Sequence, residues 1–224
     1  MKPVVIFGAG KVAEVVHYYF AHESRIEIAG ITCNRDHIRE KTFEGREVVP
    51  FEDIESVFPP LEVELFVAIG YQNMNDLRAE RVAEARAKGY RLVSFIHRHA
   101  GLPEDTELGE NCFIMNDVLI QPRVRLGDNV FVWSGALVGH HSSVGDHSWI
   151  TSAAAICGDV TLGEKCFIAA NATVGNGVRI GDRCFLGANS LVTKDLPDSS
   201  VVVQQASQKM SLTSDQFIRM STFR

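Results

Sequence analysis

From residue 102 onward, every sixth residue of the chain is aliphatic. Neither a strand, with a period of two, nor an α-helix, with a period of 3.6, produces a strict period of six. From Thr106 to Ser190, the residue four positions after each aliphatic one is small or β-branched. The aliphatic positions are Leu102, Leu108, Ile114, Ile120, Leu126, Val132, Val138, Val144, Ile150, Ile156, Leu162, Ile168, Val174, Ile180, Leu186 and Val192.

This period predicts a prism of short parallel strands with a corner every six residues. The aliphatic and small residues point inward, and glycine follows the aliphatic residue in eight repeats, where it permits the corner conformation. Three faces give a coil of about 18 residues, with strands stacked about 4.8 Å apart. We therefore expect a parallel β-helix of about five coils.

Residues 18 apart should then lie above one another. Three of the five cysteines, Cys112, Cys166 and Cys184, fall in one inward column and are interpreted as small core residues. A column of aromatic residues that points outward would form a large exposed apolar stripe, so another part of the structure should cover it. We expect a neighbouring subunit to cover it; the N-terminal domain or the C-terminal tail is the alternative. This aromatic column consists of Phe113, Phe131, Trp149, Phe167 and Phe185.

The first hundred residues have a different pattern. Residues 4–7 form an apolar run typical of a buried strand, and a glycine turn and an amphipathic helical stretch to about His22 follow it. This order predicts a Rossmann-like α/β domain of about four parallel strands. The later expected elements are strands over 26–31, 65–70 and 91–96 and a helix over 77–88.

The glycine turn, G-x-G-x-x-A from Gly8 and Gly10, places backbone amides and a helix N-terminus where a phosphate can bind. After the second strand, Asn34 and Asp36 could hydrogen-bond a ribose or base, and Arg35 could pair with a phosphate. The alternative is that both glycines only permit a tight turn. A domain of about 100 residues is too short for a complete dinucleotide fold with a hydride acceptor, so NAD is not favoured.

Composition narrows the function classes further. The 224 residues are 46% hydrophobic and 22% charged, as in ordinary globular proteins. The net charge of −6 argues against a nucleic-acid partner. The chain has no apolar run long enough for a membrane span or a signal peptide, and its five cysteines form no C-x-x-C pair. We therefore expect a cytoplasmic protein with reduced thiols.

Over about residues 100–196 the hexapeptide pattern resembles the left-handed β-helix hexapeptide acyltransferases. Together with the α/β domain, it resembles the bacterial sugar acyltransferases, which include nucleotide-amino-sugar N-acetyltransferases and the sialic-acid O-acetyltransferase group. Further matching stretches are 68–70 before Asn73 and Arg78, 95–97 before Ala100, and 194–197. The resemblance implies a homotrimer that uses acetyl-CoA or another acyl-CoA between neighbouring prisms.

The resemblance also divides the chain into a nucleotide-sugar domain (1–99), an acyltransferase prism (100–196) and a tail (197–224). Relatives tend to carry Gly-His after the glycine turn, Asp-Asp after the second strand and a Gly-x-Pro-Ala turn after the prism. Here these places hold Lys11-Val12, roughly Cys33-Asn34, and residues 203–208 without that turn. The implied substrate-binding residues are Gly8, Gly10, Lys11, Val12, Asn34, Arg35, Gly70 and Asn73.

Acyl transfer from a thioester needs a base and donors for the oxyanion, and histidine is the usual base near neutral pH. The resemblance places the base at His140 and normally an acidic residue next, but here the neighbour is His141. Eighteen residues before and after His141 are Arg123 and Asp159, and Asp159 could orient His141 or reach His140. Eighteen residues after His140 is Gly158, whose amide would polarise the thioester carbonyl.

Other interpretations of these histidines are weaker. As metal ligands, the histidine pair would need a third ligand a coil or more away, and no histidine follows His147, so no metal is expected. His147 belongs to a polar column, and we expect it to lie on the surface. The polar column consists of Asn111, Asn129, His147, Lys165 and Arg183.

By the same residue-wise resemblance, Trp149 would wall the pantetheine groove and Ala170 and Ala188 would touch the cofactor. The sequence thus predicts an acetyl-CoA-dependent N-acyltransferase acting on a nucleotide-linked amino sugar in surface-glycan synthesis. O-acetylation of a sugar is the close alternative. The missing acidic neighbour and the altered tail leave a catalytically silent binding module as an alternative from another class.

Overall fold

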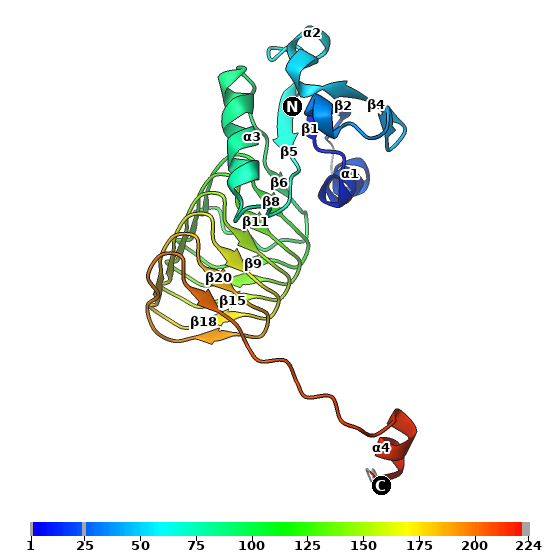
Figure 1. The fold of residues 1–224 in the computed structure, drawn as a ribbon. Helices are drawn as coiled ribbons and strands as arrows, with labels where there is room; N and C mark the ends of the chain where they lie inside the picture. The colour runs from blue at the N-terminus through cyan, green and yellow to red at the C-terminus, as the bar shows by residue number, and fades with distance from the viewer. Residues whose placement is uncertain (1, 24–25, 221–224) are drawn as a thin grey trace.

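A computed structural model describes residues 2–23 and 26–220, in which an α/β part lies against a prism that ends in an extended tail (Figure 1). The α/β part has a sheet in the order β3-β4-β2-β1-β5, in which β4, β2, β1 and β5 are parallel and β3 is antiparallel to β4. Its strands are β1 (Val4–Phe7), β2 (Ile28–Cys33), β3 (Thr42–Phe43), β4 (Arg46–Pro50) and β5 (Glu64–Val67). Its helices are α1 (Lys11–Glu23), α2 (Ile54–Val57) and α3 (Asp76–Ala87), with 3₁₀ turns η1 (Arg35–His37) and η2 (Phe51–Asp53).

The apolar periods explain most of these elements. All of β1 is buried, and α1 buries Ala13, Val16 and Phe20, which share one helical face. The strand expected over 91–96 is not continuous: Leu92 forms one bridge to Leu65, and residues 95–96 pair with the prism instead. Strand β4 was not predicted, because its apolar part is only Val48 and Val49.

The predicted prism is confirmed. Two-residue strands recur every six residues, and residues 18 apart pair in parallel, as in Phe131 with Trp149. The aromatic sheet contains β6 (Phe95–Ile96), β8 (Phe113–Ile114), β11 (Phe131–Val132), β14 (Trp149–Ile150), β17 (Phe167–Ile168), β20 (Phe185–Leu186) and β22 (Val201–Val202). The leucine sheet contains β9 (Leu119–Ile120), β12 (Leu137–Val138), β15 (Ala155–Ile156), β18 (Thr173–Val174) and β21 (Leu191–Val192). The polar sheet contains β7 (Glu107–Leu108), β10 (Arg125–Leu126), β13 (Ser143–Val144), β16 (Thr161–Leu162) and β19 (Arg179–Ile180).

The inside of the prism is a narrow apolar column. The aliphatic residues of the repeat and the small residues four positions later are buried together, including the three predicted cysteines. At the corners, side chains of later coils accept hydrogen bonds from backbone amides of earlier ones. Asp146 Oδ1 accepts from the Asp128 amide at 2.8 Å, and Asp182 Oδ1 accepts from the Glu164 amide at 2.8 Å. These bonds satisfy donors that the corner would otherwise leave unpaired.

Four of the five residues of the aromatic column, Phe113 to Phe167, are covered by the α/β part of the same chain, so the expectation of a neighbouring subunit there is wrong. Phe66 of β5 packs against Phe113 and Phe131 with ring centroids 5.8 Å apart in each pair. Tyr71 packs against Trp149 and Phe167 further along the column. The α/β part therefore stabilises the prism by taking this apolar stripe out of water.

Helix α3 packs along the polar column. Asp76, at its start, accepts hydrogen bonds from Lys165 Nζ and Arg183 Nη1, both at 2.8 Å, and these contacts lower the pKa of Asp76 to about 2. His147 is half-buried rather than on the surface as expected: its Nδ1 lies 2.9 Å from Asn129 Nδ2, and burial lowers its pKa. The polar column, at the corner between the polar and aromatic sheets, is thus a contact surface inside the chain.

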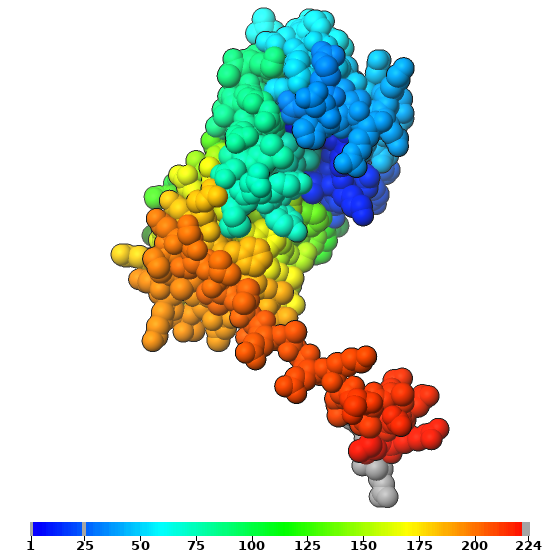
Figure 2. All heavy atoms as spheres, in the orientation of Figure 1, coloured from blue at the N-terminus to red at the C-terminus, as the bar shows by residue number. Residues whose placement is uncertain are grey.

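The tail begins as part of the prism and then leaves it. Strand β22 pairs with β20, and the chain then extends away from the body to helix α4 (Ser214–Met220), as Figures 1 and 2 show. Residues 221–224 of the predicted tail lie outside the described residues. None of the described helices is long and apolar enough to cross a membrane.

Candidate active site

His140 and His141 lie at the corner between β12 and β13, where the leucine and polar sheets meet. Both side chains are exposed, and His141 adopts the left-handed backbone conformation of a corner, with φ 61°. The His140 ring lies directly over Gly158: a Cβ added to Gly158 would lie 2.6 Å from His140 Cε1 and 2.7 Å from Nε2. Only glycine at 158 leaves room for this ring position, so the spacing of 18 brings the predicted base and amide together.

The two rings are joined to Arg123 in one polar chain. His140 Nδ1 lies 3.1 Å from His141 Nδ1, and Arg123 Nη1 lies 3.5 Å from His141 Nε2. A guanidinium only donates, so His141 Nε2 accepts, and a neutral His141 carries its proton on Nδ1. His140 Nδ1 then accepts that proton's hydrogen bond, and a neutral His140 is protonated at Nε2. His140 can accept a proton at Nε2 once Arg123 leaves His141 and the pair shifts to the opposite tautomer.

Asp159 does not take the orienting position expected for it. Its backbone amide donates to the His140 carbonyl at 2.8 Å. Its side chain is exposed, and across residues 2–23 and 26–220 no hydrogen bond or ion pair joins that carboxylate to either histidine. The physical reason is that both ring nitrogens of His141 already have partners, Arg123 and His140.

The His140 ring lies against Gly158, the residue whose amide is expected to donate to a thioester carbonyl. In this structure the amide already has a partner, because it donates to Asn176 Oδ1 at 2.9 Å. Asn176 was not predicted, although the same 18-residue spacing that predicts Gly158 leads one coil further to it.

The three residues expected to contact the cofactor do not lie together. Trp149 is 2% exposed, stacked on Phe131 and covered by Tyr71 and Arg78, so it cannot wall a groove. Membership of the covered aromatic column is the reason. Ala170 and Ala188 are exposed on the corner between the aromatic and leucine sheets. The leucine sheet thus runs between the Ala170 corner and the His140 corner.

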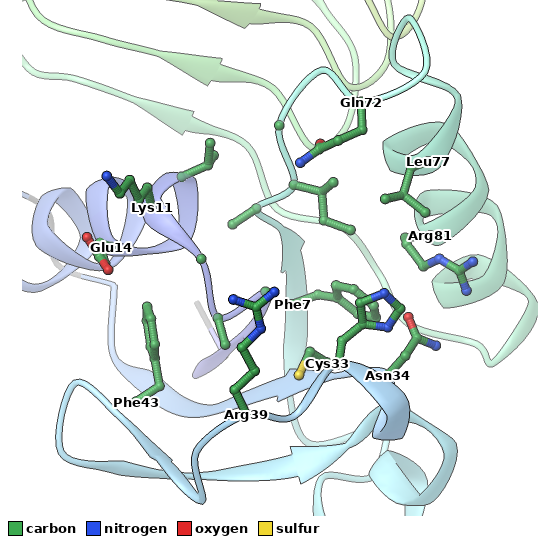
Figure 3. A pocket seen from close by; sticks show the side chains of 18 of the residues that line it. Phe7, Lys11, Glu14, Cys33, Asn34, Arg39, Phe43, Gln72, Leu77 and Arg81 are labelled. Carbon is green, nitrogen blue, oxygen red and sulfur yellow. The ribbon is translucent and has the colours of Figure 1, made fainter.

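A cavity of about 900 Å³ lies at the carboxyl ends of β1, β2 and β5 (Figure 3). Six of the eight predicted substrate-binding residues line it: Gly8, Gly10, Lys11, Val12, Asn34 and Gly70. The other two do not. Arg35 turns away to pair with Asp53 at 2.6 Å, and Asn73 is exposed in the loop after β5.

The two glycines of the turn differ. Gly8 has φ +134°, and a Cβ there would lie 2.7 Å from the Ala68 carbonyl oxygen, so the fold itself requires glycine. At Gly10 a Cβ would meet nothing within 4 Å, although the residue lines the cavity. The fold does not need glycine there, and its absent side chain leaves the N-terminus of α1 open to a ligand.

Other cavity residues escaped the sequence analysis, among them Arg39 and Phe43 after β2, Gln72 after β5 and Arg81 on α3. Figure 3 shows Arg39 rising from the segment after β2, with Lys11 and Arg81 on helices at opposite walls. Among the described residues, Lys11 and Arg39 form no ion pair, so both cations are available to an anionic ligand. The segment from 34 to 43 has no hydrophobic period, so no sequence signal directed Arg39 into the cavity.

Within one chain, the cavity and His140 lie on opposite sides of the prism. The α/β part packs on the aromatic sheet, whereas the His140 corner joins the other two sheets. Among the described residues, no three His, Cys, Asp or Glu side chains come together in a way that could hold a metal ion.

Comparison with known proteins agrees with this architecture. Residues 105–140 and 159–194 match the family described as bacterial transferase hexapeptide (six repeats). No curated protein sequence matches the chain. PerB from Caulobacter crescentus, solved in complex with CoA and GDP-perosamine, is 32% identical, with a TM-score of 0.80 over 90% of this chain and 93% of PerB.

Two further structures extend the likeness. A histidine-to-alanine mutant of the GDP-perosamine N-acetyltransferase from Caulobacter crescentus is 28% identical, with a TM-score of 0.68 over 90% of this chain and 93% of that one. The acetyltransferase domain of PglB from Neisseria gonorrhoeae is 23% identical, with a TM-score of 0.80 over 90% and 96%; at this identity it supports the fold alone. The hexapeptide prism and the match to PerB along nearly its whole length show that the chain belongs to the left-handed β-helix hexapeptide family of bacterial sugar acyltransferases.

Proposed function

We propose that the protein is an acetyl-CoA-dependent N-acetyltransferase acting on a nucleotide-linked amino sugar for surface-glycan synthesis. The observation that carries the proposal is the pairing of His140 with Gly158 on a prism whose α/β part holds a ligand-sized cavity. The similar PerB binds CoA and GDP-perosamine, a nucleotide-linked sugar.

The cavity suits the nucleotide end of such a substrate. Its volume of about 900 Å³ is in the range of small-molecule sites. The N-terminus of α1 offers backbone amides to a diphosphate, and Lys11 and Arg39 add positive charge beside them. Phe43 gives one wall an apolar face. The α/β part would thus serve as the Rossmann-like substrate domain.

The residues at the His140 corner can carry out the steps of acetyl transfer. Once Arg123 has left His141 and the histidine pair has shifted tautomer, His140 Nε2 takes a proton from the amino group as the amino nitrogen attacks the thioester carbonyl carbon. The carbonyl oxygen becomes an oxyanion and accepts a hydrogen bond from the Gly158 amide. When the intermediate collapses, the C–S bond breaks, and the CoA thiolate leaves with the proton from His140.

Because the cavity and His140 lie on opposite sides of one prism, we propose that each site forms between two copies in a cytoplasmic homotrimer. The leucine sheet offers a suitable contact face. Its outward side chains include Leu119 and Leu191, which are 50% and 65% exposed, and Leu137 between them. A second copy packed there would remove this apolar surface from water and bring its own α/β part toward the His140 corner.

A site built from two copies predicts complementation. At a nucleotide-sugar concentration well below the wild-type KM, His140→Ala and Gly10→Leu chains should each be nearly inactive alone. After they are unfolded and refolded together at equal amounts, about a quarter of the wild-type rate should return, because that share of interfaces pairs an intact His140 with an intact cavity. The rate of thiol release reports the recovery. Mixed samples that stay inactive, although mass spectrometry shows mixed oligomers, would contradict a shared site.

The cavity itself can be tested by ligand binding. Gly10→Leu should weaken binding of a nucleoside diphosphate, such as GDP or UDP, at least tenfold by calorimetry, because the new side chain enters the open space above α1. Its melting temperature should change little, since that space holds no protein atom within 4 Å. Arg35→Ala is the matched control, because Arg35 pairs with Asp53 outside the cavity. Equal loss in both variants, or in neither, would reject the cavity as the nucleotide site.

Two alternative functions are each favoured by a separate observation. A sugar hydroxyl in place of the amine fits the same corner, because a hydroxyl needs a base at least as much as an amine does. A silent binding module is suggested by the engaged state of the corner, where Arg123 holds His141 and Asn176 holds the Gly158 amide. Thiol release from acetyl-CoA with paired amino and hydroxy sugars separates all three, since the module releases no CoA with any acceptor.

A further inference from the structure

The Gly158 amide is occupied by a side chain in the position where an oxyanion would bind. Asn176 Oδ1 accepts from this amide at 2.9 Å. Donors of oxyanion holes lie about 2.7–3.1 Å from the oxygen that they stabilise. The Asn176 oxygen is also a carbonyl oxygen, as the thioester oxygen is. The structure therefore shows an internal group at the distance and with the chemistry of the acyl oxygen, bound to the glycine over which the His140 ring lies.

Side chains accept hydrogen bonds from backbone amides elsewhere on the prism, and several of these acceptors are carboxylates. Asp182 Oδ1 accepts from Glu164, and Asp195 Oδ1 accepts from Arg179 at the same corner as Asn176, both at 2.8 Å. A carboxylate holds an amide more strongly than a neutral carbonyl does. At Gly158 the acceptor is a neutral carboxamide, as it is one coil earlier, where Gln121 Oε1 accepts from the His140 amide at 2.9 Å. Asn176 is exposed, so its side chain can rotate away.

We propose that Asn176 closes the acyl-oxygen site in the free protein and is displaced by the thioester carbonyl of the acyl donor. The inference rests on the proposed acetyl transfer and deepens it. With Asn176 in place, the amide is not left unpaired and water does not need to fill the site. Part of the binding energy of the acyl donor is then used to move Asn176, so this residue sets the KM for the donor.

Three variants test the proposal. Asn176→Ala should lower the KM for acetyl-CoA roughly two- to tenfold with kcat little changed, because one competing hydrogen bond is lost. Asn176→Asp should lower kcat/KM more than tenfold, because a carboxylate holds the amide more tightly and repels the oxyanion. Asp195→Ala removes a different side chain-to-amide bond at the same corner, the one from the Arg179 amide, and should change neither constant.

A readout without turnover accompanies the kinetics. In two-dimensional NMR, the Gly158 amide signal of the wild type should move on addition of acetyl-CoA, and Asn176→Ala should already move it without ligand. An unchanged or higher KM for Asn176→Ala, with wild-type turnover normal, overturns the role of Asn176 alone. A wild-type protein that neither binds nor turns over acetyl-CoA overturns the proposed function and this inference with it.

Discussion

Replacing His140 with alanine is expected to lower the rate of acetyl transfer by roughly 10²–10⁴-fold, the usual contribution of a positioned general base. The His140 ring lies over Gly158, and its Nε2 is the ring nitrogen left for a substrate, since Nδ1 faces His141. Alanine leaves the amide in place and removes the proton acceptor. Thiol release at saturating acetyl-CoA and acceptor measures the loss.

The loss should be confined to the chemical step. His140 is exposed at a corner, so alanine should leave the melting temperature and acetyl-CoA binding close to wild type. His22→Ala is the matched control: His22 lies in α1, with Nδ1 2.9 Å from the Tyr18 carbonyl oxygen, and its replacement should not alter the rate. A His140→Ala protein that keeps more than a third of the wild-type rate would remove this histidine from the mechanism.

Replacing Arg78 with alanine is expected to lower the free energy of unfolding by about 3–5 kcal/mol, the cost of truncating a large buried side chain whose partners lose their bonds. Arg78 is fully buried, with its guanidinium 4.5 Å from the Phe131 ring centroid and 4.9 Å from that of Trp149. It donates to Asn129 Oδ1 at 2.9 Å and to the His147 carbonyl at 2.7 Å. Urea unfolding followed by tryptophan fluorescence measures the change, because Trp149 is in contact.

The charge of Arg78 opposes part of this stabilisation. Burial lowers the pKa of Arg78 to about 9, so the charged form costs stability at neutral pH, and that cost fades only as the pH rises above about 9. Arg78→Met fills most of the same space without a charge and should lose less than Arg78→Ala. A loss under about 1 kcal/mol for Arg78→Ala would mean that this contact does not hold the two parts together.

The periodic part of the molecule could be predicted because its physics is local and repeated. A period of six determines the inward residue, the corner and the partner one coil away, and so the period alone predicts that Gly158 lies beside His140. The cover of the aromatic column could not be predicted in the same way. The column showed that apolar surface must be buried, but Phe66 and Tyr71 lie in a separate segment with no periodic relation to it.

The same limit explains the errors at the site. Asp159 has the right spacing, yet spacing does not say which group a corner histidine turns toward, and His141 turns toward Arg123 and His140. Trp149 matched a position in relatives, but its place in the aromatic column put it under the α/β part. Arg39 was missed because a segment without a hydrophobic pattern carries it into the cavity.

The covered aromatic column also bears on how the molecule unfolds. In a stack of coils, each coil touches only its neighbours, so such a stack can lose its ends one coil at a time. Here Phe66 and Tyr71 of one compact body contact four successive members of the column, from Phe113 to Phe167. Peeling away any one of these coils would also break its contact with that body. The contacts between the column and the α/β part thus couple these coils, so that the stack and the α/β part unfold together as one cooperative unit.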